Sequence, residues 1–361
     1  MLHCRRIGSL QAVALDALDS MTKPGFDVRP SWLAQRVEDV LDPDLMIVDP
    51  HHHLYDRDGE RYFLPELLAD AVDGHAVRST VFVQCRHAYR TTGPAALQPV
   101  GEVEAVVATA DAAIADRRGV HACAGIVAGA DLTLGADVSA VLDAMREVAG
   151  RRFSGIRNSV AWHRHPDVRS SAILPPPHLM ADPRYRAGVR CLSRHNLSLD
   201  VWAYQTQHDE LLDLAIANPD TTIVIDHLGG PVASGPYRGK RDEMFGSWKD
   251  GLKALAALPN TRLKLGGLGM RVGGFDFHEA AGPPTSQQLA DAWRPYVETG
   301  IALFGPARCM FESNFPVDKG MYSYRTFWNA CKRLAAGASP HEKTALFSAT
   351  AIDVYKLDGV S

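Results

Sequence analysis

The feature that most constrains the fold of this chain is a repeated alternation of short apolar runs with helical stretches of three-to-four periodicity. Such alternation is typical of parallel βα units. Eight apolar runs can be counted, and eight strands close a (β/α)₈ barrel whose strands are covered on both faces. The sequence therefore predicts an α/β protein with a (β/α)₈ TIM-barrel fold. The expected strands are residues 45–49, 79–84, 121–127, 153–157, 197–202, 221–226, 262–265 and 309–312.

The length is compatible with a single barrel. The chain has 361 residues, which is ordinary for an α/β barrel, and no low-complexity linker marks a second domain. We expect residues 1–44 to form an N-terminal extension with a short helix at 31–41, in which Ser31 is the cap and Glu38 supports the first half. Residues 45–361 are expected to form the barrel.

Composition excludes several classes of protein. With 46% hydrophobic and 22% charged residues, the chain can bury enough apolar surface to fold. The net charge is −4 without a long run of either sign, which argues against nucleic acid as a partner. No apolar stretch approaches the roughly 20 residues that cross a bilayer, so we expect no membrane contact and a cytoplasmic location. The six cysteines lack C-x-x-C spacing and are expected to be reduced and buried.

The strongest chemical signal is Asp49-Pro50-His51-His52-His53 at the end of the first expected strand. Residues two apart in an extended segment point to the same side, so His51 and His53 are expected to face together into the barrel mouth. Two neutral imidazoles there can bind a divalent metal or stabilise an anionic transition state. The alternative is a histidine cluster on the surface.

The sequence resembles the amidohydrolase superfamily, and within it the lactonase-like branch related to 2-pyrone-4,6-dicarboxylate lactonase and sugar-acid lactonases. The resemblance covers nearly all of residues 31–357. It is carried by segments at the expected strand ends, namely DPHHHLYD (49–56), FVQC (82–85) with PVGE (99–102), GIR (155–157), IDHLG (225–229), LKLGG (263–267) and MFESNFPVD (310–318).

The resemblance implies that His51 and His53 line the site and that His227 polarises the scissile carbonyl or assists the attacking water. It also implies a carboxylate just past the eighth strand as general base. There the chain departs from the pattern, because Asn314 stands where relatives carry the aspartate of Ser-Asp-Trp-Pro, and an amide cannot accept a proton. We favour Asp318 as the base, with Glu312, or an amide that only orients water, as alternatives.

The replacement of that aspartate by Asn314 also affects the expected metal site. The resemblance implies a zinc site built from the two first-strand histidines, a residue of strand four or five, and the strand-eight aspartate. The fifth expected strand offers no histidine, and Asn314 replaces the aspartate. We therefore expect no tightly bound metal. The alternative is one divalent ion, zinc, held by His51 and His53.

Without a metal, cations and hydrogen-bond donors must stabilise the developing negative charge. Arg86, Arg157 and Arg164 follow strands two and four and are expected to serve here, and arginine forms two-point contacts with carboxylates. Tyr204 and Gln205, after strand five, are expected to contact a ring-shaped substrate. Each arginine can instead be an ordinary solvated side chain.

The leading hypothesis is a hydrolase that adds water to a carboxylated cyclic ester, a small-molecule lactone. A second hypothesis is a metal-dependent decarboxylase of an aromatic or unsaturated acid. A third, motivated by Asn314, is an inert barrel that acts as a binding protein. The sequence leaves a homo-oligomer open, and it does not identify the substrate.

Overall fold

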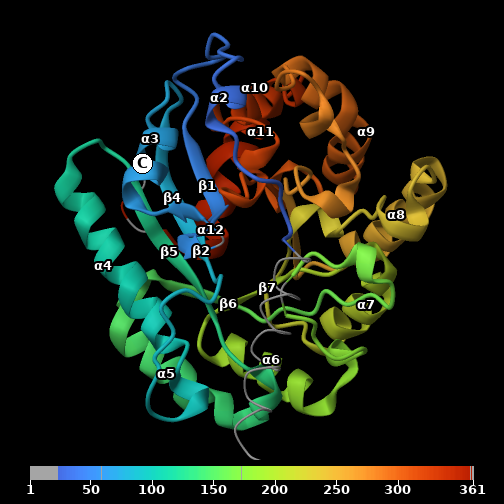
Figure 1. The fold of residues 1–361 in the computed structure, drawn as a ribbon. Helices are drawn as coiled ribbons and strands as arrows, with labels where there is room; N and C mark the ends of the chain where they lie inside the picture. The colour runs from blue at the N-terminus through green and yellow to red at the C-terminus, as the bar shows by residue number, and fades with distance from the viewer. Residues whose placement is uncertain (1–22, 58, 172, 358, 360–361) are drawn as a thin grey trace, which may run out of the picture.

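The computed structural model describes residues 23–57, 59–171, 173–357 and 359. Eight parallel strands form one sheet in the order β1-β4-β5-β6-β7-β8-β9-β10. All eight expected strands are present, and the sheet curves into a nearly closed (β/α)₈ barrel, which confirms the predicted fold (Figure 1). The strands are β1 (Ile47–His52), β4 (Val77–Val83), β5 (His121–Gly129), β6 (Phe153–Arg157), β7 (Ser198–Val201), β8 (Ile223–Ile225), β9 (Thr261–Leu265) and β10 (Cys309–Phe311).

Helices surround the strands and follow one another around the ring in chain order (Figure 1). Their starts have recognisable sequence causes, such as the Asp182 carboxylate that caps α6 ahead of Pro183. A small antiparallel hairpin, β2 (Tyr55–Arg57) and β3 (Glu60–Tyr62), follows β1. The helices are α2 (Pro30–Leu33), α3 (Leu64–Ala71), α4 (Val100–Asp116), α5 (Val138–Ala149), α6 (Pro183–Arg194), α7 (His208–Ala217), α8 (Arg241–Ala256), α9 (Ser286–Phe304), α10 (Tyr324–Leu334), α11 (Pro340–Thr344) and α12 (Thr350–Tyr355).

The first and last strands meet at their carboxyl ends. The Asn314 N–H donates to the His51 carbonyl at 3.0 Å, and the His53 N–H donates to the Phe315 carbonyl at 2.8 Å. The Ser313 hydroxyl and backbone N–H both donate to the buried carboxylate of Asp49, at 2.6 and 3.0 Å. These bonds hold the segment after β10 against the histidines of β1.

The barrel interior is apolar toward the amino ends of the strands. There a buried cluster packs against the C-terminal helix α12, which closes that end of the barrel. The cluster consists of Val48, Val81, Val83, Val127, Val224 and Met310, together with Ala351, Val354, Tyr355 and Leu357. Alternate strand residues point to the same side, so the side chains two positions farther on share this interior. Two positions beyond Val224 and Met310 are the buried acids Asp226 and Glu312. At these two strands the carboxyl half of the interior is therefore polar.

The helix expected at 31–41 is much shorter than predicted. Only Pro30–Leu33 is helical, and Ser31 lies inside this helix instead of capping it. Glu38 accepts a hydrogen bond from the backbone N–H of Ser286 at 2.7 Å, so its carboxylate caps the start of α9. The tertiary partner has therefore overridden the local helical pattern. The rest of the expected extension, residues 1–22, lies outside the described residues.

Two further expectations concern membrane-spanning helices and the state of the cysteines. Among the described residues, no helix is both long and apolar enough to span a bilayer. Cys85, Cys123, Cys191, Cys309 and Cys331 are all buried and unpaired, as predicted, whereas Cys4 lies outside the described part of the chain.

Candidate active site

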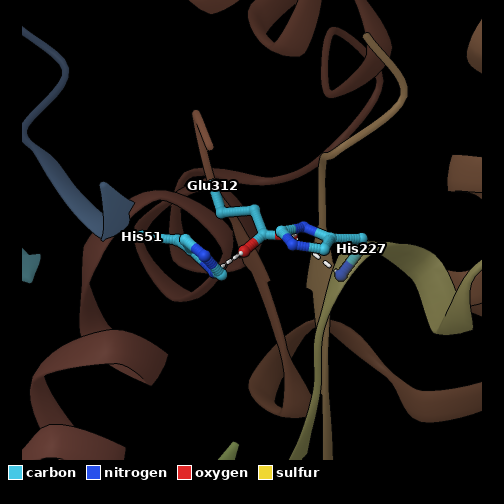
Figure 2. Close-up of side chains that lie close together, drawn as sticks. All are labelled: His51, His227 and Glu312. Atoms are coloured by element: carbon cyan, nitrogen blue, oxygen red, sulfur yellow. Dashed lines mark hydrogen bonds and ion pairs between the residues drawn. The ribbon is translucent and has the colours of Figure 1, made fainter. Parts of the chain in front are cut away.

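Glu312 lies between two imidazoles at the carboxyl end of the barrel. Its Oε1 is 2.7 Å from Nδ1 of His227, and its Oε2 is 2.7 Å from Nδ1 of His51 (Figure 2). The His227 backbone N–H donates to the same Oε1 at 2.9 Å. Burial by itself raises the pKa of Glu312, but the adjacent imidazoles of His227 and His51 hold that pKa below its ordinary value. Glu312 is therefore an ionised carboxylate that fixes both rings.

The contact with Glu312 sets the tautomer of His227. A carboxylate only accepts hydrogen bonds, so Nδ1 of His227 carries the hydrogen and the lone pair lies on Nε2. The Trp202 ring packs edge-on against this imidazole, with ring centroids 4.8 Å apart. The arrangement of carboxylate, imidazole and lone pair is that of an oriented general base.

His51 and His53 converge on the same place, as the spacing predicted. Their ring centroids are 4.9 Å apart, and those of His51 and His227 are 4.6 Å apart. Nδ1 of His53 donates to the Val83 carbonyl at 2.7 Å, which leaves its lone pair on Nε2. Burial is the largest influence on the pKa of both first-strand histidines, and with the cations Lys264 and Arg157 nearby it holds their pKa values well below the ordinary range. Both imidazoles are therefore neutral.

A buried lysine lies directly beneath these histidines. Lys264 Nζ is 2.8 Å from Asp200 Oδ2, 3.1 Å from Asp226 Oδ1 and 3.2 Å from His51 Nδ1. Burial lowers the pKa of Lys264, but the attraction of Asp200, Asp226 and Glu312 is stronger and places that pKa above its ordinary value. Lys264 is a permanent ammonium inside the barrel.

Arginine, histidine and amide groups line an open cavity of about 730 Å³ above this centre. Arg157 is at its floor with 13% of the side chain exposed, and its Nη1 is 3.3 Å from His51 Nε2. Its guanidinium also donates to the Gln84 carbonyl. Other residues of the lining are His53, Arg57, Arg86, Trp202, His227 and Asn314, and an apolar part formed by Ile173, Leu174, Pro175 and Pro176.

The structure separates the three candidates for the missing base. Asn314 lines the cavity, and its Nδ2 donates to Asp318 Oδ1 at 2.8 Å. Asp318 is fully buried, and its Oδ2 accepts from Tyr322 and from the Gly269 N–H. Asp318 thus orients Asn314, whereas Glu312 contacts both histidines.

The remaining predicted side chains lie at different distances from the cavity. Arg86 and Arg157 belong to its lining, and Arg164 is exposed and is not among the lining residues described. Tyr204 is buried and bonds to Ser170 at 2.7 Å. The amide of Gln205 is occupied by the Met244 carbonyl, Ser247 and the Val232 N–H.

Sequence reasoning assigned no role to Lys264, Asp200 or Asp226. Each lies in or directly after an expected strand, and a charged side chain within an otherwise apolar barrel strand was the available signal. Arg57 was also overlooked, because the hairpin β2–β3 that carries it has no distinct sequence pattern.

The residues present fit a divalent metal ion. His51, His227 and Glu312 each offer a ligand atom within 4.8 Å of the others, and two imidazoles with one carboxylate suit zinc. Glu312 Oε2 is buried, and its 2.7 Å contact with His51 Nδ1 is an ion pair without hydrogen-bond geometry, which leaves this oxygen suited to a cation. The group differs from the predicted pair, since Glu312 and His227 join His51 in place of His53.

Comparison with known proteins supports the predicted family. The family model for amidohydrolases matches residues 48–357. An uncharacterised protein of Sinorhizobium fredii is 33% identical over 336 residues, which are 87% of this chain and 99% of that protein. An L-fucono-1,5-lactonase of Burkholderia multivorans is 27% identical over 212 residues, 58% of this chain and 65% of the lactonase.

Solved structures agree on the fold. An amidohydrolase from Burkholderia multivorans has a TM-score of 0.67 at 21% identity, covering 86% of this chain and 99% of that one. A second crystal form of an amidohydrolase from Burkholderia multivorans, with bound zinc, has a TM-score of 0.64 at 20% identity, covering 86% of this chain and 99% of that one. A candidate 2-pyrone-4,6-dicarboxylic acid hydrolase from Pseudomonas putida has a TM-score of 0.56 at 18% identity, covering 87% and 98%.

Proposed function

Because the chain belongs to the amidohydrolase family, we propose that it is a hydrolase that opens a carboxylate-bearing lactone by adding water to the ester carbonyl. The observation that carries this proposal is the pair formed by His227 and Glu312, with Nδ1 and Oε1 2.7 Å apart at the floor of the cavity. This His227–Glu312 pair has the geometry of a general base held by a carboxylate.

The chemistry follows from the positions of the donors and acceptors. Nε2 of His227 accepts a proton from water as the water oxygen attacks the carbonyl carbon. Negative charge then develops on the carbonyl oxygen, and the Arg157 guanidinium beside His51 stabilises it. When the ring C–O bond breaks, the His227 imidazolium returns its proton to the departing alkoxide. Glu312 stabilises this imidazolium without itself becoming protonated.

A divalent ion held by His51, His227 and Glu312 supplies, when bound, Lewis-acid polarisation of the carbonyl and a more acidic water. The tautomer of His227 and the orientation of Asn314 by Asp318 are properties of the chain itself. The oxygen of the oriented Asn314 amide is a hydrogen-bond acceptor, suited to a water or hydroxyl group in the cavity.

The lining of the cavity supports the substrate class. Arg57, Arg86 and Arg157 present three guanidinium groups, which bind carboxylates by paired N–H bonds. The apolar part of the lining suits the carbon face of a ring. The lactonase among the relatives acts on an L-fucono-1,5-lactone, as its name states, and this agrees with a cyclic ester as substrate.

The proposal is tested with a panel of five- and six-membered lactones, with and without a carboxylate, on the wild type and on the variants His227→Ala and Glu312→Gln. We expect the wild type to hydrolyse a carboxylated lactone and each variant to lose about 10²- to 10⁴-fold in kcat/KM. Hydrolysis at the same background rate by wild type and variants would instead favour an inert barrel. Release of CO₂ from an aromatic or unsaturated acid, without lactone hydrolysis, would favour a decarboxylase.

A further inference from the structure

Lys264 occupies the centre of a cage of metal-binding groups. Its side chain is fully buried, and Nζ lies 2.8 Å from Asp200, 3.1 Å from Asp226 and 3.9 Å from Glu312. Nδ1 of His51 is 3.2 Å away. Carboxylate oxygens and imidazole nitrogens are the donors that divalent manganese and zinc take in proteins. The ammonium is thus surrounded as a metal ion would be.

The cage has more negative charge than its cations balance. Three carboxylates, those of Asp200, Asp226 and Glu312, face Lys264 and the more distant Arg157, whose Nη1 is 3.9 Å from Asp226. Both oxygens of Asp226 and Oε2 of Glu312 are buried, and among the described residues none accepts a well-directed hydrogen bond. Their close contacts are ion pairs instead. Lys264 Nζ is 3.1 Å from Asp226 Oδ1, Arg157 Nη1 is 3.9 Å from Asp226 Oδ2, and His51 Nδ1 is 2.7 Å from Glu312 Oε2. The acids are thus held mainly by charge, which indicates a preference for positive charge at this place.

We propose that Lys264 is a built-in substitute for a metal ion, which fills the position among Asp200, Asp226, Glu312 and His51 that a divalent cation would otherwise take. The tethered ammonium therefore restricts metal binding in this protein to the outer group of His51, His227 and Glu312. Glu312 belongs both to the groups around Lys264 and to the outer group. A cation bound in the outer group is therefore close to the Lys264 ammonium and is repelled by it.

The proposal predicts that removal of the ammonium creates a cation site. Lys264→Met keeps the length and apolar volume of the side chain and leaves the three carboxylates without their central charge. We expect the variant to bind one more Mn²⁺ per chain than the wild type, and any ion shared with the wild type to be held at least about tenfold more tightly. The inference does not depend on the substrate, since its readout is metal uptake.

Lys332 offers a matched control, because it is the other lysine described as fully or nearly buried. Its Nζ donates to the Leu41 and Asp42 carbonyls and contacts His75 Nδ1 at 2.8 Å, and no carboxylate oxygen of the described residues is within ion-pair distance of it. Lys332→Met therefore removes a buried ammonium without opening a cage of acids. We expect this variant to bind as many ions as the wild type.

The experiment is equilibrium dialysis of each purified protein against Mn²⁺, followed by elemental analysis, with the Mn²⁺-dependent rise in melting temperature as a second readout. One extra ion and a larger thermal shift in Lys264→Met alone would support the proposal. A folded Lys264→Met that binds no more Mn²⁺ than the wild type would overturn it, as would an equal gain in Lys332→Met.

A second variant keeps the test decisive if Lys264→Met is insoluble. The double variant Lys264→Met/Asp200→Asn removes one positive and one negative charge, so the net charge of the cage is unchanged while Asp226, Glu312 and His51 still converge. Extra Mn²⁺ in this variant supports the proposal. Uptake at the wild-type level, or failure to fold even when refolded with Mn²⁺, counts against it.

Discussion

Asn314 and Asp318 illustrate how a single neighbour determines which side chain a position can hold. The Asp318 carboxylate accepts from Asn314 Nδ2 at 2.8 Å, from the Tyr322 hydroxyl at 2.6 Å and from the Gly269 N–H at 2.9 Å. The amide of Asn314 is therefore required as a donor. An aspartate at 314, the residue expected from relatives, would place two carboxyl groups in contact.

We predict that Asn314→Asp makes stability strongly dependent on pH. Burial already raises the pKa of Asp318 to about 6, and a second carboxyl group raises the pKa of the pair further. The folded state then binds more protons than the unfolded state, so the free energy of unfolding falls as pH rises above about 4 through the folded pKa. Relative to wild type, the variant should lose roughly 1–3 kcal/mol at about pH 8 and little at about pH 5, in urea unfolding. An equal loss at both pH values would contradict this account.

Arg86 provides a test of the carboxylate preference. It lines the cavity and its guanidinium carbon lies 5.2 Å from the centre of the Tyr89 ring, whereas Arg164 is exposed and outside the described lining. Arg86→Gln should raise KM for a carboxylated lactone by about 10-fold or more and leave KM for a neutral lactone unchanged. For Arg164→Gln we expect both values to stay near wild type. An equal rise in KM for the carboxylated lactone in both variants would contradict a specific role of Arg86 in binding the carboxylate.

At the scale of elements, strands were easier to predict than the helix near the N-terminus. The barrel strands are short, mostly apolar runs that are largely buried in each βα unit, so the pattern alone locates them. The helix expected at 31–41 ended at Leu33 because the Glu38 carboxylate bonds to Ser286, nearly 250 positions away in the chain. A partner so distant leaves no mark on the local sequence.

Glu102 joins two elements beside the cavity. It lies in the first turn of α4, and its Oε1 accepts from the backbone N–H groups of Cys85 and His87 at 3.1 and 2.8 Å. It thereby holds the loop after β4, which carries Arg86, against the helix. Burial raises the pKa of Glu102 to about 7, well above the ordinary value of 4.5.

Glu102→Gln should therefore stabilise the protein at high pH. In the wild type, the folded state holds the Glu102 proton up to about pH 7 while the unfolded state releases it near pH 4.5, so stability falls between these values. Glutamine keeps an acceptor for both N–H groups and does not titrate. We expect little difference in the free energy of unfolding at about pH 5 and a gain of about 2–3 kcal/mol for the variant at about pH 8. A variant less stable than wild type at about pH 8 would refute this.

At the scale of the whole molecule, the candidate site was only partly accessible from sequence. His51, His53 and His227 could be placed in one mouth because barrel topology brings strand ends together. The side chain that contacts these histidines could not be predicted, because Glu312, Asn314 and Asp318 all follow β10 and differ in the direction of their side chains. The cluster of Lys264 with its acids could not be predicted from sequence. It depends on distances between side chains of β7, β8, β9 and β10, which only the closure of the barrel determines.

The two ends of the barrel are connected through one buried acid. Asp200 accepts from the Tyr355 hydroxyl of α12 at 2.6 Å on one side and from Lys264 Nζ at 2.8 Å on the other. Tyr324 makes a comparable bond to Asp49 at 2.9 Å, but Asp49 also accepts from Ser313 and from the His51 N–H. The closing helix is thus coupled to the centre that holds His51.

We predict that Tyr355→Phe lowers the free energy of unfolding by about 1.5–3 kcal/mol, because it removes a hydrogen bond to a buried carboxylate and keeps the ring in its apolar cluster. Tyr324→Phe should cost less, since three other hydrogen bonds to Asp49 remain, whereas Asp200 keeps two, from Lys264 and from the Ser198 hydroxyl. Urea unfolding of both variants at one pH measures the difference. Equal losses would mean that Asp200 gains no more from Tyr355 than Asp49 gains from Tyr324, and that α12 closes the barrel through apolar packing alone.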